Sequence, residues 1–508
     1  MNEAAPVVIA GAGPVGLSVA LGLARHGVRS LVLEKAAAPA PFARAGVLLP
    51  RSLEIFRAWG IIADIRRECI APDRLDACDA ATGHTLAQID FDVLRSETLE
   101  PGPVFLSQAR TEAILLDHVR RSGHSDVRFG HALTGFEQSE GGVAVAVQPS
   151  AAEPYVVRTP FLVGADGAGS AVRGVRGLAL EGETYPGKVM LAVVRVADAR
   201  DAQPWPRLRF DTSEYLAALR FAPQRWRIIA ALTPNEPDAD AVAPAAIERR
   251  VVATLGAGPF ETEWASTFAI HRRHAASFAV GRVLLVGDAA HLNSPVGAQG
   301  LNAGLADAHN LSWKLAHALR GGDWSALLAS YDAERRQAIV HGTERFTDPV
   351  TKLILRSGKS LRRVLLASAG SIMRVRSLRR RALRIAMMLA VRYERSPLLF
   401  GSGGLIGLRA PNPALAATDR ATLVHYGYPP GALDALTLPE GAATMTLDSS
   451  QAACWRTRAP FAALVRPDGY IGWLERGPSR ETIEGSVARA LALPRNGDER
   501  RRAVGREG

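Results

Sequence analysis

The stretch VLLVGDAAHLNSPVGAQGLNAGLADAHNLSWKLA, residues 283–316, decides the fold of this chain. It begins with a short apolar β-run and breaks at Gly287-Asp288. A Pro- and Gly-rich loop then leads into a helical pattern from about Leu301 to Leu319. The first N–H groups of such a helix have no internal partners and carry partial positive charge, so they favour an anion. With a carboxylate at the strand end, the stretch can hold a hydroxylated, phosphate-bearing cofactor. Taken alone, it also fits an ordinary strand–loop–helix unit.

A second glycine-rich turn lies near the N-terminus. The apolar strand 7–10 runs into GAGPVG (11–16), a helix follows to Arg25, and the next strand ends at Glu34. Glycines at this spacing let the backbone approach a pyrophosphate and let the helix pack on the strand. Glu34 would accept hydrogen bonds from ribose hydroxyls. The pattern predicts dinucleotide binding and leaves FAD and NAD both open.

A third turn follows the predicted strand 161–163 and reads GADGAGS (164–170), with Asp166 as its acid. Two further polar residues stand at the ends of predicted elements. Arg44 precedes a helical pattern within 42–60, where it either approaches the cofactor or is a solvated surface residue. Gln108 sits where a strand end meets a helix, and either its amide contacts a cofactor or it caps the helix.

Composition limits the class of protein. With 508 residues, and about 100–200 residues per domain, the chain has room for about three domains. Its 47% hydrophobic and 22% charged residues are typical of a globular protein. The three cysteines form no CxxC, which argues against disulfides or a cysteine zinc site and fits a reducing cytosol. We find no signal peptide and no apolar run of the ~18 residues that a membrane span needs.

Metal and nucleic-acid functions are also disfavoured. The histidines at 271, 274 and 291 are not at a convincing metal-binding spacing and H-E-x-x-H is absent, so we predict no metal site. The net charge of +11 comes from one region, because 352–395 holds 13 Lys/Arg and one acid. We therefore predict no nucleic-acid partner. The simplest interpretation of 352–395 is a helix pair with a solvated basic face, and the alternative is a helix that binds a membrane surface or a partner.

Period-two patterns dominate from about 184 to 268, with one helical stretch at 245–255. Strands inserted between two cofactor-binding halves suggest a sheet that covers the cofactor and binds substrate. Tyr215, Arg220 and Trp226 are the candidate substrate contacts, although each is also compatible with sheet surface or core. We predict an α/β fold with these limits: 1–180, first part of a Rossmann-like dinucleotide-binding domain, which the resemblance described next makes an FAD-binding domain; 181–270, an inserted mixed-sheet substrate domain; 271–395, the second part with a helical basic segment; 396–495, a C-terminal domain containing a β-hairpin at 461–474; and 496–508, a disordered basic tail.

Together, GAGPVG with Glu34, GADGAGSAVR and VGDAAHLNSPVGAQGLNAG resemble the single-component flavin-dependent aromatic hydroxylases related to p-hydroxybenzoate and phenol hydroxylase. The resemblance covers roughly 5–345. The end of the chain, with SPLLFG, RAPNPAL and LVRPDGYIGWLERG, is similar to the thioredoxin-like domain of longer members that act on hydroxyphenylpropionate or aromatic polyketides. That domain lacks CxxC here, so we expect no redox role for it. Two positions depart from the family's pattern. Ala298 replaces a commoner glycine, and the residues between Gln108 and the acid Glu112 are Ala-Arg-Thr, without the leucine that usually precedes the acid.

The resemblance implies non-covalent FAD, with Asp288 on the ribityl chain and Pro295 along the flavin edge, where its carbonyl is the one catalytic candidate. The expected cofactor contacts are Gly11, Gly13, Pro14, Val15, Gly16, Glu34, Lys35, Arg44, Gln108, Asp166, Asp288, Pro295, Gly300, Leu301 and Asn302. NAD(P)H would be a co-substrate bound without a second Rossmann domain, since only one GxGxxG occurs.

The implied reaction is hydroxylation of a small aromatic substrate, phenolic or polyketide-like, with NAD(P)H and O₂ through a flavin C4a-hydroperoxide. The alternatives are epoxidation, Baeyer–Villiger oxygenation, hydroxylation of a drug or a quinone precursor, and a flavin-binding scaffold without turnover. We expect a cytoplasmic monomer or homodimer.

Overall fold

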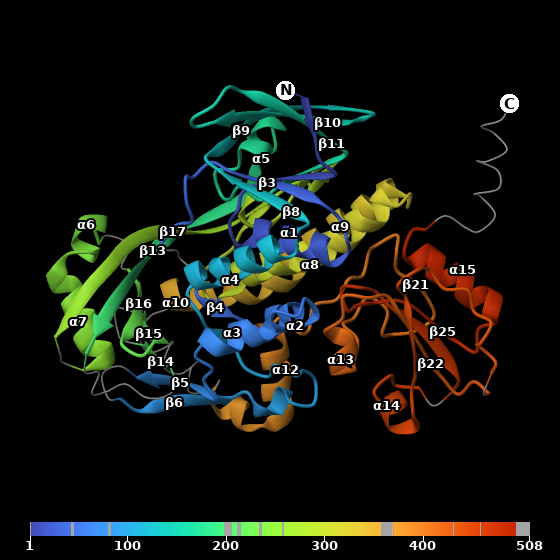
Figure 1. Cartoon of the computed structure of the whole chain (residues 1–508). Coiled ribbons are helices and arrows are strands. Elements are labelled where there is room, and N and C mark those ends of the chain that lie inside the picture. Colours follow the sequence, from blue (N-terminus) through green and yellow to red (C-terminus); the bar gives the residue numbers. More distant parts are fainter. Residues whose placement is uncertain are drawn as a thin grey trace.

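A computed structural model of the chain describes residues 2–41, 45–79, 83–197, 206–210, 215–232, 236–256, 259–356, 368, 370–429, 431–457 and 459–493. It is an α/β fold with mixed sheets (Figure 1). Arg44, most of the connection between α10 and α12, and the predicted tail lie outside these residues. Among the described helices, each is too short or too polar to cross a bilayer.

A six-stranded sheet forms the centre of the fold. Its order is β18-β19-β12-β2-β3-β8, and every pairing is parallel except that of β18. The strands are β18 (Ala279–Val280), β19 (Val283–Leu285), β12 (Phe161–Gly164), β2 (Val7–Ala10), β3 (Ser30–Glu34) and β8 (Ser125–Phe129). Strands β2, β12 and β19 are fully buried, as expected for a parallel sheet covered on both faces. Because these three strands are neighbours, the three predicted turns leave the same edge of the sheet.

Helices flank the central sheet, and the longest, α8, begins at Gln299, two residues before the predicted start. The helices of this part are α1 (Pro14–Arg25), α2 (Pro50–Ala58), α3 (Ile62–Glu68), α4 (Gln108–Arg121), α5 (Ala171–Val175), α8 (Gln299–Leu319), α9 (Trp324–Gln337), a π-helix (Ala338–Glu344), α10 (Arg345–Arg356) and α12 (Arg376–Ala386), with 3₁₀ turns at Asp92–Leu94 and Gly287–Ala289. The short strands β4 (Val47–Leu48) and β7 (Val104–Phe105) pair beside them.

A smaller, four-stranded sheet comes mostly from the segment between β8 and β12. Strand β10 (Gly142–Pro149) pairs antiparallel with β9 (His131–Ser139) and β11 (Tyr155–Thr159), and β1 (Asn2–Ala4) adds in parallel at the edge. Val143, Val145 and Val147 alternate inward onto the main core, as the period-two pattern requires.

The inserted sheet is larger than predicted. It has eight strands in the order β20-β17-β13-β16-β15-β14-β5-β6. The strands are β20 (His291–Leu292), β17 (Phe260–Ala275), β13 (Leu180–Val196), β16 (Arg225–Ala231), β15 (Tyr215–Ala222), β14 (Arg207–Phe210), β5 (Arg74–Asp79) and β6 (Thr85–Asp90), with α6 (Asp238–Ala241) and α7 (Pro244–Leu255) packed near them. Strands β5 and β6 come from 1–180, so that predicted segment contributes to both sheets. Pairing β5 with β14 crosses more than a hundred residues, and strand periodicity does not specify such a partner.

The C-terminal unit is a five-stranded mixed sheet in the order β21-β25-β24-β22-β23. Its elements are β21 (Phe400–Gly401), α13 (Pro413–Ala416), β22 (Thr422–Tyr426), β23 (Ala443–Thr446), α14 (Ser449–Ala453), β24 (Phe461–Val465), β25 (Ile471–Arg476) and α15 (Arg480–Ala490). The antiparallel β24–β25 pair confirms the predicted hairpin. Figure 1 shows this unit, in orange and red, on the side of the molecule away from α6 and α7.

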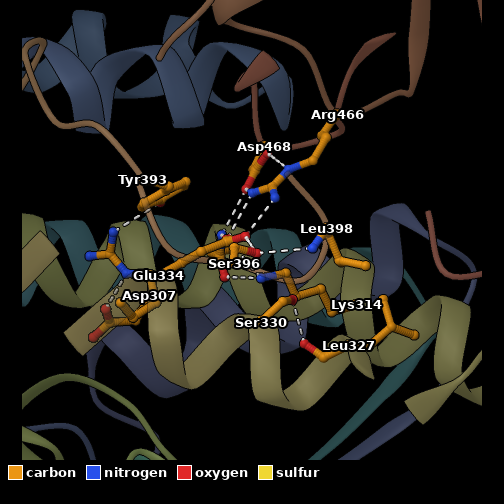
Figure 2. A network of polar contacts seen from close by, with 12 residues as sticks. Asp307, Lys314, Leu327, Ser330, Glu334, Tyr393, Ser396, Leu398, Arg466 and Asp468 are labelled. Carbon is orange, nitrogen blue, oxygen red and sulfur yellow. Dashed lines mark hydrogen bonds and ion pairs between the residues drawn. The ribbon is translucent and has the colours of Figure 1, made fainter. Parts of the chain in front are cut away.

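A fully buried ionic network joins the C-terminal unit to α8 and α9 (Figure 2). Arg466, in the hairpin turn, donates to both carboxylate oxygens of Glu334 at 2.6 and 2.8 Å and to Asp468 at 2.6 Å. Lys314 and Asn310 of α8 each donate to Glu334 Oε2 at 2.8 Å. Because buried charges are tolerated only when they are paired and hydrogen-bonded, this contact fixes how the two units dock.

One charge in this network can be tested directly. Burial alone would raise the pKa of Glu334, but the neighbouring Arg466 and Lys314 more than offset it and hold that pKa below its usual range. Glu334→Gln leaves two buried cations short of a counter-charge, so we expect a loss of about 3–5 kcal/mol in the free energy of unfolding, measured with urea near neutral pH.

Because the folded-state pKa of Glu334 is depressed, its contribution to stability is present above the unfolded pKa of about 4 and is lost as the pH falls. The difference between the two proteins should therefore shrink in acid. Asp117→Asn, which breaks an exposed ion pair with Arg121, is the control and should cost at most about 1 kcal/mol. Equal effects of both substitutions would contradict the role of the network.

Candidate functional site

The three glycine-rich turns open onto one cavity of about 1040 Å³ between the central sheet and the inserted sheet. It is bordered by the ends of β2, β12 and β19, by the start of α8 and by the inner face of the inserted sheet. Thirteen of the predicted site residues line it: Gly11, Gly13, Pro14, Val15, Glu34, Lys35, Gln108, Asp166, Tyr215, Asp288, Pro295, Gly300 and Leu301.

The glycines of the first turn have separate roles. Gly11 has φ of 104°, and a Cβ there would lie 2.4 Å from the carbonyl oxygen of Ala165. A Cβ on Gly16 would lie 1.9 Å from the carbonyl oxygen of Gly11, so this glycine, which does not line the cavity, is required for packing. A Cβ on Gly13 would meet no atom within 4 Å. The backbone at Gly13 is therefore open to close approach by a ligand, as a pyrophosphate requires.

Glu34 lies at the end of β3, as predicted, and its carboxylate is held by the backbone. Its Oε2 accepts from the Ala12 N–H and its Oε1 from the Ala36 N–H, both at 2.9 Å. These bonds fix the acid at the rim of the first turn, where its remaining lone pairs can accept from a diol. Lys35 beside it is exposed.

Gln108 is the first residue of α4, whereas Ser107 is the N-cap that accepts from the Arg110 N–H. The Gln108 Oε1 accepts from the Ala45 N–H at 3.1 Å, and its Nε2 donates to Glu112 at 2.7 Å. Burial raises the pKa of Glu112. Gln108 therefore orders the segment after Arg44 and faces the cavity, and the helix-capping interpretation is wrong.

Asp166 lines the cavity and organises the third turn. Its Oδ1 accepts from the Ser170 hydroxyl at 2.5 Å and its Oδ2 from the Val172 N–H at 3.1 Å, at the start of α5. Arg173 of the same helix donates to the Ala289 carbonyl at 3.0 Å. The turn after β12 is thereby joined to the turn that carries Asp288.

The central turn presents Asp288 and a helix N-terminus to the cavity. Asp288 is exposed, whereas Gly287 and Ala289 on either side are buried. The N-cap of α8 is Ala298, with φ of 57° and no side-chain cap, and its N–H donates to the Pro295 carbonyl at 3.0 Å. The left-handed conformation costs alanine about 1–2 kcal/mol. The uncapped first turn of α8, with Gly300 and Leu301, faces the cavity.

The turn is braced from behind by buried Asp307. One carboxylate oxygen of Asp307 accepts from the Gly287 N–H at 3.0 Å and from His291 at 2.8 Å, and the other accepts from Arg335 at 2.7 Å. The sequence offered one signal for this residue, an acid within the largely apolar helical pattern that follows Leu301. Its partners lie up to 28 residues away, so the sequence analysis missed it.

Asn302 does not line the cavity. Its side chain is buried, accepts from the Leu49 N–H at 2.8 Å and the Ser52 hydroxyl at 2.6 Å, and donates to the Val47 carbonyl at 2.9 Å. It therefore fixes β4 and α2 against the start of α8. The structure thus gives Asn302 a supporting position behind the start of α8, and not the direct cofactor contact that we predicted.

Two of the three predicted substrate contacts are misplaced. Trp226 is buried against α7, and Arg220, its cross-strand partner, stacks on it with the guanidinium 5.7 Å from the ring centre. Both side chains point to the outer face of the sheet, whereas Tyr215 faces the cavity. Alternate residues of a strand point to opposite faces, and the composition of these strands did not show which face is inward.

The inward face carries Arg227, one residue from Trp226, together with an apolar wall that the sequence analysis did not identify. Arg227 donates to the Ala45 carbonyl at 3.0 Å and lies 4.9 Å from the centre of the Phe221 ring. Burial lowers the pKa of Arg227 to about 10, so it is a cation at neutral pH. Other wall residues are Leu219, Phe221, Ile229, Trp264, Phe268 and His271.

The residues present fit a dinucleotide with a polar, anionic middle and a flat ring at one end. The open backbone at Gly13 and the uncapped N-terminus of α1 suit a pyrophosphate. Glu34 and Asp288 stand at the two ends of that path as acceptors for hydroxyls. Among the described residues, no group of three or more His, Cys, Asp or Glu could hold a metal ion.

The comparisons with known proteins agree with this geometry. The model of the family described as FAD binding domain matches residues 4–346. The 12-dehydrotetracycline 5-monooxygenase/anhydrotetracycline 6-monooxygenase of Streptomyces rimosus is 32% identical over 505 residues, which cover 92% of this chain and 94% of that protein. A 3-(3-hydroxy-phenyl)propionate/3-hydroxycinnamic acid hydroxylase of Burkholderia cenocepacia is 34% identical over 340 residues, covering 65% of this chain and 60% of that protein.

Solved structures match over nearly the whole chain. The OxyS anhydrotetracycline hydroxylase of Streptomyces rimosus superimposes with a TM-score of 0.78 at 29% identity, covering 97% of this chain and all of that one. Aklavinone-11 hydroxylase, solved with FAD and aklavinone, has the same fold, with a TM-score of 0.81 at 24% identity and the same coverage.

Asp288→Ala tests the central turn. Because Asp288 faces the cavity from a turn that Asp307 holds independently, the variant should fold, as judged by circular dichroism, but purify with little or no yellow cofactor. Asp323→Ala, which removes the N-cap of α9, controls for general loss of an acid and should keep its cofactor. Full flavin occupancy in the Asp288 variant would count against its role on the ribityl chain.

Proposed function

Because the chain belongs to the FAD-binding-domain family of flavin-dependent monooxygenases, we propose that it hydroxylates a multi-ring phenolic substrate with NAD(P)H and O₂. One observation carries the proposal: the cofactor cradle and an apolar, aromatic-lined chamber are a single cavity of about 1040 Å³. That volume is at the upper end of small-molecule sites, as expected where cofactor and substrate share one space.

FAD would lie along the path from Glu34 past Gly13 to Asp288, with Gln108, Asp166 and Lys35 at its sides. Pro14 and Val15 would close the first turn against it, and Arg44 stays a predicted contact. Bound there, the flavin supplies the redox chemistry and the activation of oxygen. The protein's part is to bind, to orient, to exclude water and to stabilise charge.

The loop before α8 would lie along the flavin edge. The first turn of α8, at Gly300 and Leu301, would direct its unpaired N–H groups and its positive end at negative charge on the reduced ring. The Pro295 carbonyl already accepts a hydrogen bond from the Ala298 N–H. Its second lone pair could accept another from the hydroxyl group that is to be transferred to the substrate ring. The Pro295 carbonyl stays the predicted catalytic group, and the start of α8 would stabilise charge beside it.

The substrate chamber excludes water with apolar and aromatic side chains and offers one buried cation, Arg227. A cation held in an apolar site favours the anionic form of a bound phenol, and a phenolate is the more electron-rich ring. Arg227 would thus make the bound ring more reactive. Tyr215 stays a predicted contact on the same wall.

Of the relatives that match more than 90% of the chain, two are named for anhydrotetracycline and one for 6-methylpretetramide, whereas the hydroxyphenylpropionate enzyme matches over a shorter span. This favours a polycyclic substrate over a single ring. Identifying the product would distinguish hydroxylation from epoxidation or Baeyer–Villiger oxygenation. Any catalytic turnover would exclude a flavin-binding scaffold without activity.

We infer that 396–495 is a thioredoxin-like domain. Its β22 and β23 are parallel, an antiparallel hairpin of β24 and β25 follows, and α14 and α15 connect and close the sheet. Its single cysteine, Cys454, cannot form an internal redox pair. The limits 1–180, 181–270 and 271–395 stay our proposal for the two parts of the FAD-binding domain and the substrate domain between them, with β5, β6 and β20 added to the substrate sheet. The cytoplasmic location and the monomer or homodimer state stay predictions.

The function is tested by NADPH and NADH oxidation with single-ring phenols and polycyclic phenols, following peroxide in parallel. We expect a yellow protein whose flavin reduction accelerates with a polycyclic ligand, with little peroxide and a product heavier by one oxygen atom. Faster turnover of a single-ring phenol than of any polycyclic phenol would assign the enzyme to single-ring substrates instead. A protein that takes up no FAD would overturn the proposal.

Arg227→Met tests the cation in the chamber. Without it, a bound phenol must lose its proton unaided, so we expect kcat to fall by about 10²-fold near pH 7 and to recover as the pH rises. Arg227→Lys should restore much of the rate, and Arg220→Met, on the outer face of the same sheet, should change neither kcat nor its pH profile. An Arg227→Met variant with an unchanged pH profile would contradict this role.

A further inference from the structure

The helical arm, defined as residues 370–386 and including α12, is held to β6 and to the segment that follows it through only some of its arginines. Gly370 lies so close to β6 that a Cβ would come within 2.0 Å of the Leu86 carbonyl oxygen. Arg379 pairs with Asp90 and Asp92 at 3.4 Å, and Arg380 and Arg384 pair with Glu97. These three arginines therefore face carboxylates, and the expected solvated basic face is reduced to the remaining arginines of the arm.

The outward side of the helical arm is apolar. Ile372, Val375, Leu378 and Ile385 are 48%, 49%, 44% and 41% exposed, and they make up half of the large exposed hydrophobic residues that the structure describes. Leu378 and Ile385 are seven residues apart and therefore share one face of α12. An apolar group of this kind at a monomer surface marks an interaction site.

Unpaired positive charge borders these apolar residues. Arg374, Arg376 and Arg381 are exposed, and none forms an ion pair within the described part of the chain. The arm thus combines apolar side chains directed outward with arginines that have no counter-ion, while its other arginines face carboxylates. Basic amphipathic helices with this arrangement bind in the plane of anionic lipid surfaces.

The same helix forms a wall of the cavity. Leu383, Ala386 and Met387 line it, and Gln299 at the start of α8 donates to the Ala386 carbonyl at 3.2 Å. The outward and inward faces of α12 are therefore separated by one helix diameter, about 10 Å. A lipophilic molecule at the outward face would be close to the chamber.

We propose that the outward face of the helical arm docks on an anionic lipid surface, with Ile372, Val375, Leu378 and Ile385 at the acyl boundary and Arg374 and Arg381 on lipid phosphates. A second copy of the chain is a poorer occupant, because a two-fold contact through this face would bring arginines against arginines. The proposal concerns binding alone and stands whichever substrate the enzyme uses.

The experiment is co-sedimentation of the FAD-loaded enzyme with vesicles that contain phosphatidylglycerol and with vesicles of phosphatidylcholine alone. We expect binding to the first, release by added salt, and little binding to the second. Leu378→Gln/Ile385→Gln and Arg374→Glu/Arg381→Glu should each weaken binding about tenfold or more, because each removes one half of the contact.

Matched controls lie elsewhere on the surface. Val252→Gln changes a residue of α7 that is also 44% exposed, and Arg480→Glu reverses an exposed charge on α15, so neither should alter binding. Unchanged flavin content and an unchanged unfolding midpoint would confirm that the variants fold. If the Leu378→Gln/Ile385→Gln protein does not fold, Leu378→Gln alone takes its place in the binding experiment. Failure of the wild-type enzyme to bind the anionic vesicles would overturn the proposal, as would unchanged binding by both arm variants. A lipid-free dimer that the arm variants dissociate would assign the face to a second copy instead.

Discussion

The pairing of buried charges along α8 and α9 is the constraint on which the rest of the structure depends. Asp307 and Lys314 on one helix and Glu334 and Arg335 on the other are almost wholly shielded from water. Each can be ionised there only because its partners are in place, so the two helices have a single favourable register. Asp307 transmits that register to the turn at Gly287, and Glu334 transmits it to the C-terminal unit. The same pair of helices therefore holds both the turn that carries Asp288 and the C-terminal unit in place.

Much of the cofactor half could be predicted from the sequence because its signals are local. A glycine at a positive φ, an acid at a strand end and an apolar run of four residues each have a short-range physical cause. The order of the sheet then brings the turns after β2, β12 and β19 together. Glu34, Asp166 and Asp288 accordingly lie where the pattern predicted. Arg44 falls outside the described residues, and the functional roles of the others stay predictions.

The substrate half could not be predicted to the same degree, since its determinants are non-local. Strand periodicity shows that alternate residues share a face but not which face is inward, so Trp226 was chosen where Arg227 lines the cavity. The addition of β5 and β6 to the inserted sheet depends on a pairing across more than a hundred residues. Asn302 and Asp307 support the loop through partners that no spacing rule connects. Only tertiary packing reveals such residues.

The position of Arg466 has a consequence for the order of synthesis. A chain leaving the ribosome completes α8 and α9 well over a hundred residues before this arginine emerges. Until then Glu334 lacks its bidentate partner, so the junction between α9 and the C-terminal unit cannot form. N-terminal domains commonly fold first during translation. In this chain the last domain can dock only at the end of synthesis, when Arg466 reaches Glu334.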